Sequence, residues 1–78
     1  MPTVLRPGPY RVYFYSHEGN ERPHVHVDRD ERTAKLWLGP VAMARNVGFG
    51  AWELRRIERL LARYEPVLLE AWYEYFSE

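Results

Sequence analysis

The chain has 78 residues, 46% of them hydrophobic and 15% aromatic, with eleven basic residues, eleven acidic residues and no cysteine. This length predicts one domain over residues 1–78, and the composition excludes disulfides and cysteine-ligated zinc. Zero net charge argues against strong non-specific nucleic-acid binding, and without a long apolar run or a secretory signal pattern we expect a cytoplasmic protein with no membrane segment.

The first part of the chain has the pattern of β-strands separated by turns. Short runs rich in β-branched and aromatic residues alternate with Gly, Pro and charged clusters, as consecutive antiparallel strands do. A sheet half is therefore expected at residues 1–46. The expected strands are a short Val4–Leu5, then Tyr10–Tyr15, Val25–Asp28 and Thr33–Leu38, with Val41–Arg45 either a further strand or irregular.

Residues 50–77 form the expected helical half. From Ala51 the apolar residues follow a helical period, which predicts an amphipathic helix. Pro66 stands where a second helix would begin, since the first turn tolerates a missing amide donor, and this helix would run to about Phe76. The apolar stripes are Leu54, Ile57, Leu60, Leu61 and Tyr64 in the first helix, and Leu68, Ala71, Trp72 and Tyr75 in the second.

These elements predict an α+β domain, an antiparallel sheet of three or four strands with two C-terminal helices packed on one face. Strict alternation along the strands divides the sheet into two faces. The face under the helices would bury Val12, Phe14, Val25, Val27, Ala34, Leu36 and Leu38. The open face would carry Arg11, Tyr13, Tyr15, His24, His26, Lys35 and Trp37.

Two histidines are the strongest functional signal. His24 and His26 are two residues apart in a strand-like segment, so their side chains share a face of the sheet. Imidazoles serve as general base and general acid near neutral pH, and Arg11 or Lys35 would stabilise charge on a phosphorane-like transition state. One hypothesis is therefore a metal-independent, cofactor-free ribonuclease. Its binding surface would be the rings of Tyr13, Tyr15 and Trp37, which suit stacking on unpaired bases.

A divalent transition metal at His24 and His26 is the alternative for the same pair. Two imidazoles at this spacing reach one ion, but such sites usually hold three or four protein ligands. The residues available to complete the shell are His17, Glu18, Glu21 and Asp28. His-x-His alone is a weak signal, so the metal stays an alternative.

A third hypothesis is a protein-binding module. Tyr, Trp and Arg are the residue types that dominate interface hot spots. The chain has twelve aromatic residues, so some are expected on the surface, where they would favour a homo-oligomer or a permanent protein partner. Arginines on the outer face of the first helix offer a surface for phosphates or an acidic partner, although such rows are more often only solvated. The helix residues concerned are Arg55, Arg56, Arg59 and Arg63; Glu18, Asn20 and Arg45 are further candidate binding residues.

Several motifs together resemble a small bacterial family, domain of unknown function 4160. They are Met1–Arg6, Glu18–Glu21 with Pro23–Val27, Ala44–Asn46 with Gly48-Phe49, and Leu69–Trp72 with Glu74–Phe76. The resemblance covers nearly the whole chain, with departures at His17 and Arg22. It implies a component of a bacterial toxin–antitoxin module with a cognate small protein partner. We therefore expect a toxin–antitoxin-like protein whose open sheet face engages that partner or RNA, or alternatively a non-catalytic interaction or metal-binding domain.

Overall fold

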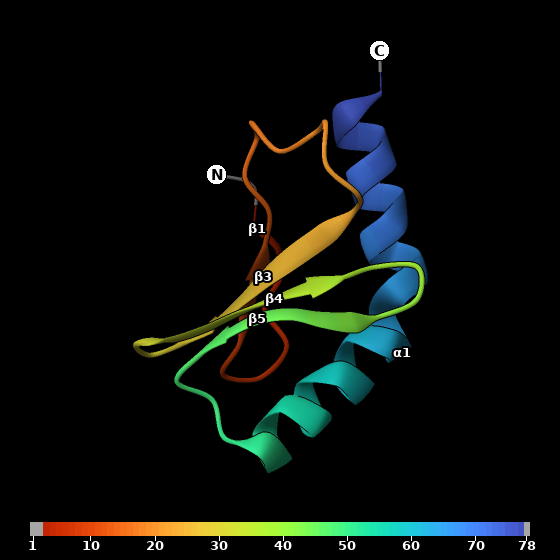
Figure 1. Ribbon diagram of the computed structural model, residues 1–78. Coiled ribbons are helices and arrows are strands. Elements are labelled where there is room, and N and C mark those ends of the chain that lie inside the picture. Colours follow the sequence, from red (N-terminus) through yellow and green to blue (C-terminus); the bar gives the residue numbers. More distant parts are fainter. Residues whose placement is uncertain (1–2, 78) are drawn as a thin grey trace.

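Five antiparallel strands form one sheet in the order of the chain. The structure, a computed structural model, describes residues 3–77. Each strand pairs with the next one, so the sheet is a simple meander with β1 and β5 at its edges (Figure 1). The strands are β1 Thr3–Leu5, β2 Arg11–Tyr13, β3 His24–Arg29, β4 Arg32–Trp37 and β5 Ala42–Val47.

The expected α+β class is confirmed, with five strands in place of three or four. The short N-terminal strand is present, and the segment left open at Val41–Arg45 forms β5. Its pattern is ambiguous in the sequence because the last four residues of β5 are exposed. What makes it a strand is its backbone pairing with β4, in which Lys35 lies opposite Arg45. This pairing satisfies backbone groups of β4 that would otherwise form an open edge.

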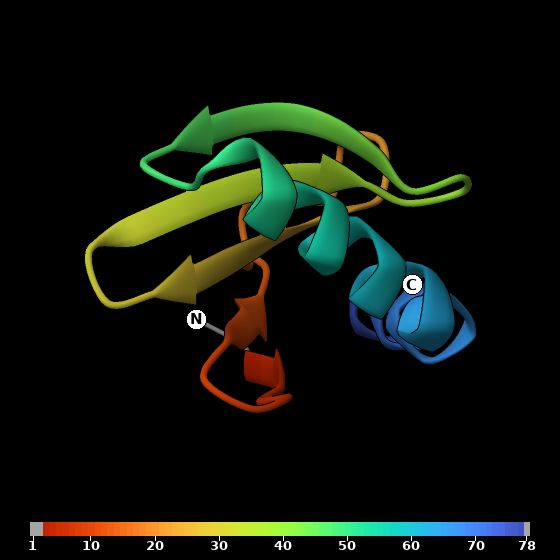
Figure 2. The same cartoon turned by 90° about the horizontal axis from the view of Figure 1, so that it is seen from below.

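The expectation of two C-terminal helices is wrong. One helix, α1, runs from Ala51 to Phe76 with Pro66 in its interior. Figures 1 and 2 show that its first half lies across one face of the sheet and that the helix then changes direction. A proline inside a helix removes one hydrogen bond and bends the axis. The helix continues past this bend because buried Leu61 and Leu68 anchor both sides of it in the same core.

The predicted core face of the sheet is confirmed. Every residue assigned to it is at most 2% exposed, and the helix packs against it through Ile57, Leu61 and Leu68. Leu54, Leu60 and Tyr64 are partly buried against the same cluster. Tyr10 and Phe49 complete the core from the turns that precede β2 and α1. Burial of this apolar surface is the main term that stabilises so small a domain.

The predicted open face is correct only in part. Tyr13 is 4% exposed and His24 is completely buried, so neither stands open to solvent as expected. β3 begins beside the C-terminal half of α1, where that half rises past the end of the sheet (Figure 1). Trp72 of the helix reaches His24 at this point, with ring centroids 5.0 Å apart. The alternation along β3 holds, but a distant element covers its first residue.

A buried carboxylate fixes the start of α1 to the sheet. Glu53, in the first helical turn, receives hydrogen bonds of 2.7 and 2.8 Å from the Arg29 guanidinium and of 2.7 Å from the Tyr10 hydroxyl. Gly50 occupies the N-cap position and has no side chain to cap the helix. The negative charge of Glu53 in the first turn interacts favourably with the positive end of the helix dipole instead. Among residues 3–77, no helix has the apolar length needed to cross a membrane.

We expect acid to remove the contribution of Glu53 to stability. The Arg29 hydrogen bonds, aided by Tyr10, hold the pKa of Glu53 at about 2, below its ordinary 4.5. A lowered pKa stabilises the fold above about pH 4.5, and this stabilisation is lost as the pH falls toward 2. Glu53→Gln should lower Tm at pH 7 and flatten Tm between these limits, measured by circular dichroism. Glu58→Gln, on the same helix, is the control, and equal acid sensitivity of wild type and Glu53→Gln would contradict the prediction.

A second prediction concerns the core beneath the bend. Leu61 is fully buried, so Leu61→Ala should lower the free energy of unfolding by about 2–5 kcal/mol in urea titrations. Val67, half exposed on the other side of Pro66, is the matched control, and Val67→Ala should cost about 0.5 kcal/mol or less. Similar losses in both variants would show that the helix does not pack as described.

Candidate metal centre

Three potential metal ligands meet where the β2–β3 loop crosses the start of β3. They are Glu18 from the loop and both histidines of the strand, His24 and His26. Glu18 Oε1 lies 2.9 Å from His24 Nε2 and 3.2 Å from His26 Nε2, and one donor atom from each residue falls within 4.8 Å of the others. The site is largely enclosed, with side-chain exposures of 10%, 0% and 15% respectively.

The loop is folded so that the Glu18 carboxylate turns inward. A backbone hydrogen bond from Glu18 N to Tyr15 O closes a turn, and Glu18 Oε1 accepts a 3.0 Å hydrogen bond from the Tyr15 amide. A further backbone bond, from Glu21 N to Glu18 O, continues the turn. The carboxylate is therefore held by its own backbone and is not a freely rotating surface acid.

His24 is oriented by a carbonyl group and by two tryptophans. Its Nδ1 lies 2.8 Å from the carbonyl oxygen of Arg22, and since that oxygen can only accept, Nδ1 carries the proton and donates it. Trp37 and Trp72 flank the ring, with centroids 5.7 and 5.0 Å away. Nε2 consequently lies on the side of the ring nearest Glu18, inside the protein, and has no hydrogen-bond partner among residues 3–77.

The short distance between His24 Nε2 and Glu18 Oε1 is a contact without hydrogen-bond geometry. The two atoms are 2.9 Å apart, yet the oxygen lies off the direction in which the ring nitrogen points. Two ligands of one ion have this relation to each other, because each donor points at the ion and not at its neighbour. Across a tetrahedral ion with bonds of about 2.0–2.1 Å, adjacent donors are about 3.3 Å apart, close to the 2.9–3.3 Å observed around Glu18.

Aromatic rings fix His26 in a similar way. Tyr13 stacks on the imidazole at 5.3 Å, and Tyr15 contacts it edge-on at 4.9 Å. His26 Nε2 lies 3.2 and 3.3 Å from the two Glu18 oxygens. The tyrosine rings expected to stack on bases are therefore used, at least in part, to position this histidine.

The C-terminal half of α1 holds the ligand-bearing loop in place. Phe14, at the start of the loop, packs on Trp72 and Phe76 with ring centroids 5.2 and 5.4 Å apart. Gly19 lies so close to the Phe76 ring that a Cβ at this position would collide with it. A side chain here would require the Phe76 ring to move, so the glycine allows the residue next to Glu18 to pack closely against the helix end.

The protonation states of two of these groups suit cation binding. Burial opposes ionisation of Glu18, but the hydrogen bond from the Tyr15 amide and the adjacent imidazoles outweigh it and hold the pKa of its carboxyl below the usual value. Burial lowers the pKa of His26, although the Glu18 carboxylate favours its charged form. An ionised carboxylate beside a neutral imidazole is the state in which these side chains bind metals.

The structure brings some of the sequence-predicted site residues together and separates others. One pocket is lined by Glu18, His26, Lys35, Tyr13, Tyr15 and Arg45. Asp28 also lines this pocket, where it accepts a hydrogen bond from the Tyr13 hydroxyl. Of the further ligands considered, Glu18 alone joins the histidines; Glu21 pairs with Lys35 at 3.0 Å. Trp37 packs against the His24 ring, and the candidates farther from the cluster are His17 and Asn20, exposed in the loop, Arg11 on the sheet, and Arg55, Arg56 and Arg59, exposed on α1.

Sequence reasoning missed two contributors to the site. The Arg22 carbonyl fixes the His24 tautomer, and Arg22 precedes a proline, which biases its backbone toward an extended conformation. Trp72 covers His24 from 48 positions later in the chain. The first signal was present in the Arg22-Pro23 step, but no local pattern indicates the second.

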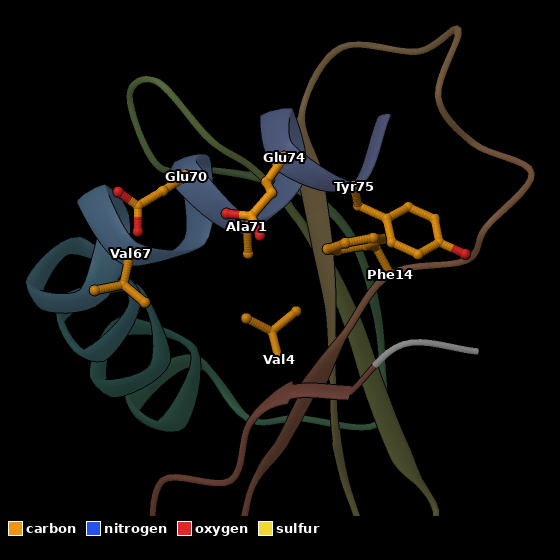
Figure 3. Close-up of a pocket in the computed structure, with 7 residues that line it drawn as sticks. All are labelled: Val4, Phe14, Val67, Glu70, Ala71, Glu74 and Tyr75. Carbon is orange, nitrogen blue, oxygen red and sulfur yellow. The ribbon is translucent and has the colours of Figure 1, made fainter. Parts of the chain in front are cut away.

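A larger hollow, of about 610 Å³, lies elsewhere, between β1 and the C-terminal half of α1. Figure 3 shows Val4, Val67 and Ala71 pointing into it, with the carboxylates of Glu70 and Glu74 on the helix side. None of the described residues that line it is a histidine or a basic residue. The candidate functional site is therefore the smaller pocket of about 450 Å³ beside His26, where groups with metal-binding chemistry converge.

Comparison with known proteins yields a family and no closer relative. No curated protein and no solved structure matches this chain. The family described as Domain of unknown function (DUF4160) matches residues 10–73, a range that contains all three potential ligands. The chain belongs to the DUF4160 family.

Proposed function

We propose that the protein is a metal-binding domain that holds one divalent transition-metal ion on Glu18, His24 and His26. The observation that carries this proposal is the buried Nε2 of His24, which has no hydrogen-bond partner in the described part of the chain and lies 2.9 Å from a carboxylate oxygen. Leaving a buried polar atom without a partner costs about 1–3 kcal/mol. A cation bound among the three donors removes that cost.

The hydrogen bond at the other side of the His24 ring supports an ion in preference to a structural proton. Metal-bound histidines almost always donate their second ring N–H to a carbonyl or carboxylate, as His24 does to Arg22. A proton on Nε2 would instead have to point toward Glu18, and the oxygen lies outside hydrogen-bond geometry. The burial of His24 also argues against its expected role as an acid–base catalyst in contact with a substrate.

The ligand set indicates the class of ion. Two imidazoles and one carboxylate suit borderline ions such as Zn²⁺, Fe²⁺ or Co²⁺ and do not suit Ca²⁺ or Mg²⁺, which require oxygen ligands. Three protein ligands also leave at least one coordination position for water or another ligand. His26 and Glu18, but not His24, line the neighbouring pocket, so the remaining position would face that pocket.

Metal titration tests the proposal. We expect Zn²⁺ and Co²⁺ to bind with one-to-one stoichiometry by calorimetry, and to raise Tm in a manner that a chelator reverses, because an ion that binds only the folded state stabilises it. His26→Ala and Glu18→Gln should each weaken metal binding by about 100-fold or more, since even loss of a group that hydrogen-bonds to a metal ligand costs about 10–100-fold.

His17 provides a matched control for the metal titration. It is a histidine of the same loop, but it is exposed and outside the ligand cluster, so His17→Ala should bind the ion like wild type. His24→Ala removes a buried side chain, so its fold is checked by circular dichroism before its affinity is interpreted. Equal affinities in wild type, folded Glu18→Gln and folded His26→Ala would refute the proposed site.

A second candidate function is a role in a toxin–antitoxin-like module, acting on RNA or a small protein partner. The observation that favours it is the row of Tyr13, His26, Lys35 and Arg45, which are cross-strand partners on four neighbouring strands. Cross-strand partners share a face of the sheet, so aromatic, titratable and basic groups are presented together. This arrangement suits either ligand class.

Growth of a bacterial host tests this second candidate. If the chain is a toxin that acts through this row, its induction should arrest growth, and His26→Ala should relieve the arrest while the exposed-loop variant His17→Ala should not. Both variants are compared at equal soluble expression. Normal growth on induction of the wild-type chain would exclude the toxin role and redirect the search to a partner protein.

A further inference from the structure

The pocket beside the candidate metal centre combines two basic side chains with the face from which an ion would be accessible. Lys35 and Arg45 lie directly opposite each other on β4 and β5, and Lys35 is also the cross-strand partner of His26. Neighbouring strands are about 4.8 Å apart, so these groups are one and two strands away from the ligand His26. All three line the same pocket of about 450 Å³.

The arrangement of these two cations is costly without an anion. Like charges directly opposite each other destabilise a strand pair. Lys35 is partly compensated by Glu21, at 3.0 Å, and lies over the Trp37 ring at 4.7 Å. Arg45 is exposed at the rim. Two acids line the pocket, and each already has another role. Glu18 is the proposed metal ligand, and Asp28 accepts a hydrogen bond from the Tyr13 hydroxyl.

We infer that the pocket binds a phosphate group, held jointly by the metal ion, Lys35 and Arg45. This inference rests on the proposed metal site. With a divalent ion in place, the pocket carries a net positive charge, because the ion, Lys35 and Arg45 together outweigh Glu18 and Asp28. A phosphate has enough oxygens to occupy the open metal position and to accept from a guanidinium at the same time.

A carboxylate ligand fits the same charges less well. Its two oxygens lie close together in one plane, so coordination of the ion leaves at most one for the basic side chains. The tetrahedral phosphate presents oxygens in several directions and can reach both strands. Phosphate can come from a small molecule or from the backbone of an RNA strand, and both sources share this chemistry.

The visible spectrum of the Co²⁺-loaded protein provides the test, because a ligand entering the open position changes the absorption of the ion. The probes are inorganic phosphate, adenosine monophosphate, a short oligouridylate and acetate. We expect the phosphate probes to shift the spectrum with saturation and acetate to bind at least about tenfold more weakly. A much tighter oligouridylate would identify an RNA backbone as the source, and equal affinities of the phosphate probes would identify a small phosphate.

Two variants and a control examine the basic residues. Lys35→Ala and Arg45→Ala should each weaken phosphate binding at least about tenfold without weakening Co²⁺ binding, since neither side chain is a metal ligand and each repels a cation. Arg6→Ala, at an exposed arginine just after β1, should change neither affinity.

The possible failures are distinguishable. If Co²⁺ binds but phosphate leaves its spectrum unchanged, the phosphate inference is wrong and the metal site stands. If Co²⁺ does not bind, both are wrong. If calorimetry shows that phosphate binds equally with and without Co²⁺, the joint site is wrong, although the basic residues bind an anion.

Discussion

The hydrogen bond from His24 Nδ1 to the Arg22 carbonyl is the constraint on which the site depends. It fixes the tautomer and the direction of a completely buried imidazole, so that the opposite nitrogen must face Glu18. Had the ring been flipped, Cδ2 would face the Arg22 carbonyl and Cε1 would take the place of Nε2, so no nitrogen of His24 would lie beside Glu18. The Arg22 carbonyl, whose position depends on the proline that follows it, therefore orients His24 so that Nε2 is available as a potential metal ligand.

The sheet and its buried face were predictable because their causes are local. Period-two alternation placed Val25, Val27, Ala34 and Leu36 on one side, and burial of that side requires no knowledge of the rest of the chain. The helix boundary at Pro66 was not predictable in the same way. Local rules favour a break at a proline, and packing of Leu61 and Leu68 into one core overrides them.

The sequence indicated which residues form the candidate site, but it did not indicate that they are buried. His24, His26 and Glu18 all stood out in the sequence, because two imidazoles share a strand face and an acid lies a short loop away. Their burial depends on Trp72, which contacts His24 from the far end of the chain. Such a contact follows from tertiary packing alone, so sequence reasoning assigned an open catalytic face to a residue that is enclosed.

The packing of the loop against the helix end has a consequence for kinetics. Phe14, Gly19 and His24 all contact the last turns of α1, so the loop cannot swing away while those turns remain folded. Local opening of the ligand cluster and fraying of the helix C-terminus are then one cooperative event. For an ion held there, withdrawal of Glu18 and His24 would require the helix end to open, so the dissociation rate of the ion would depend on the stability of that helix end.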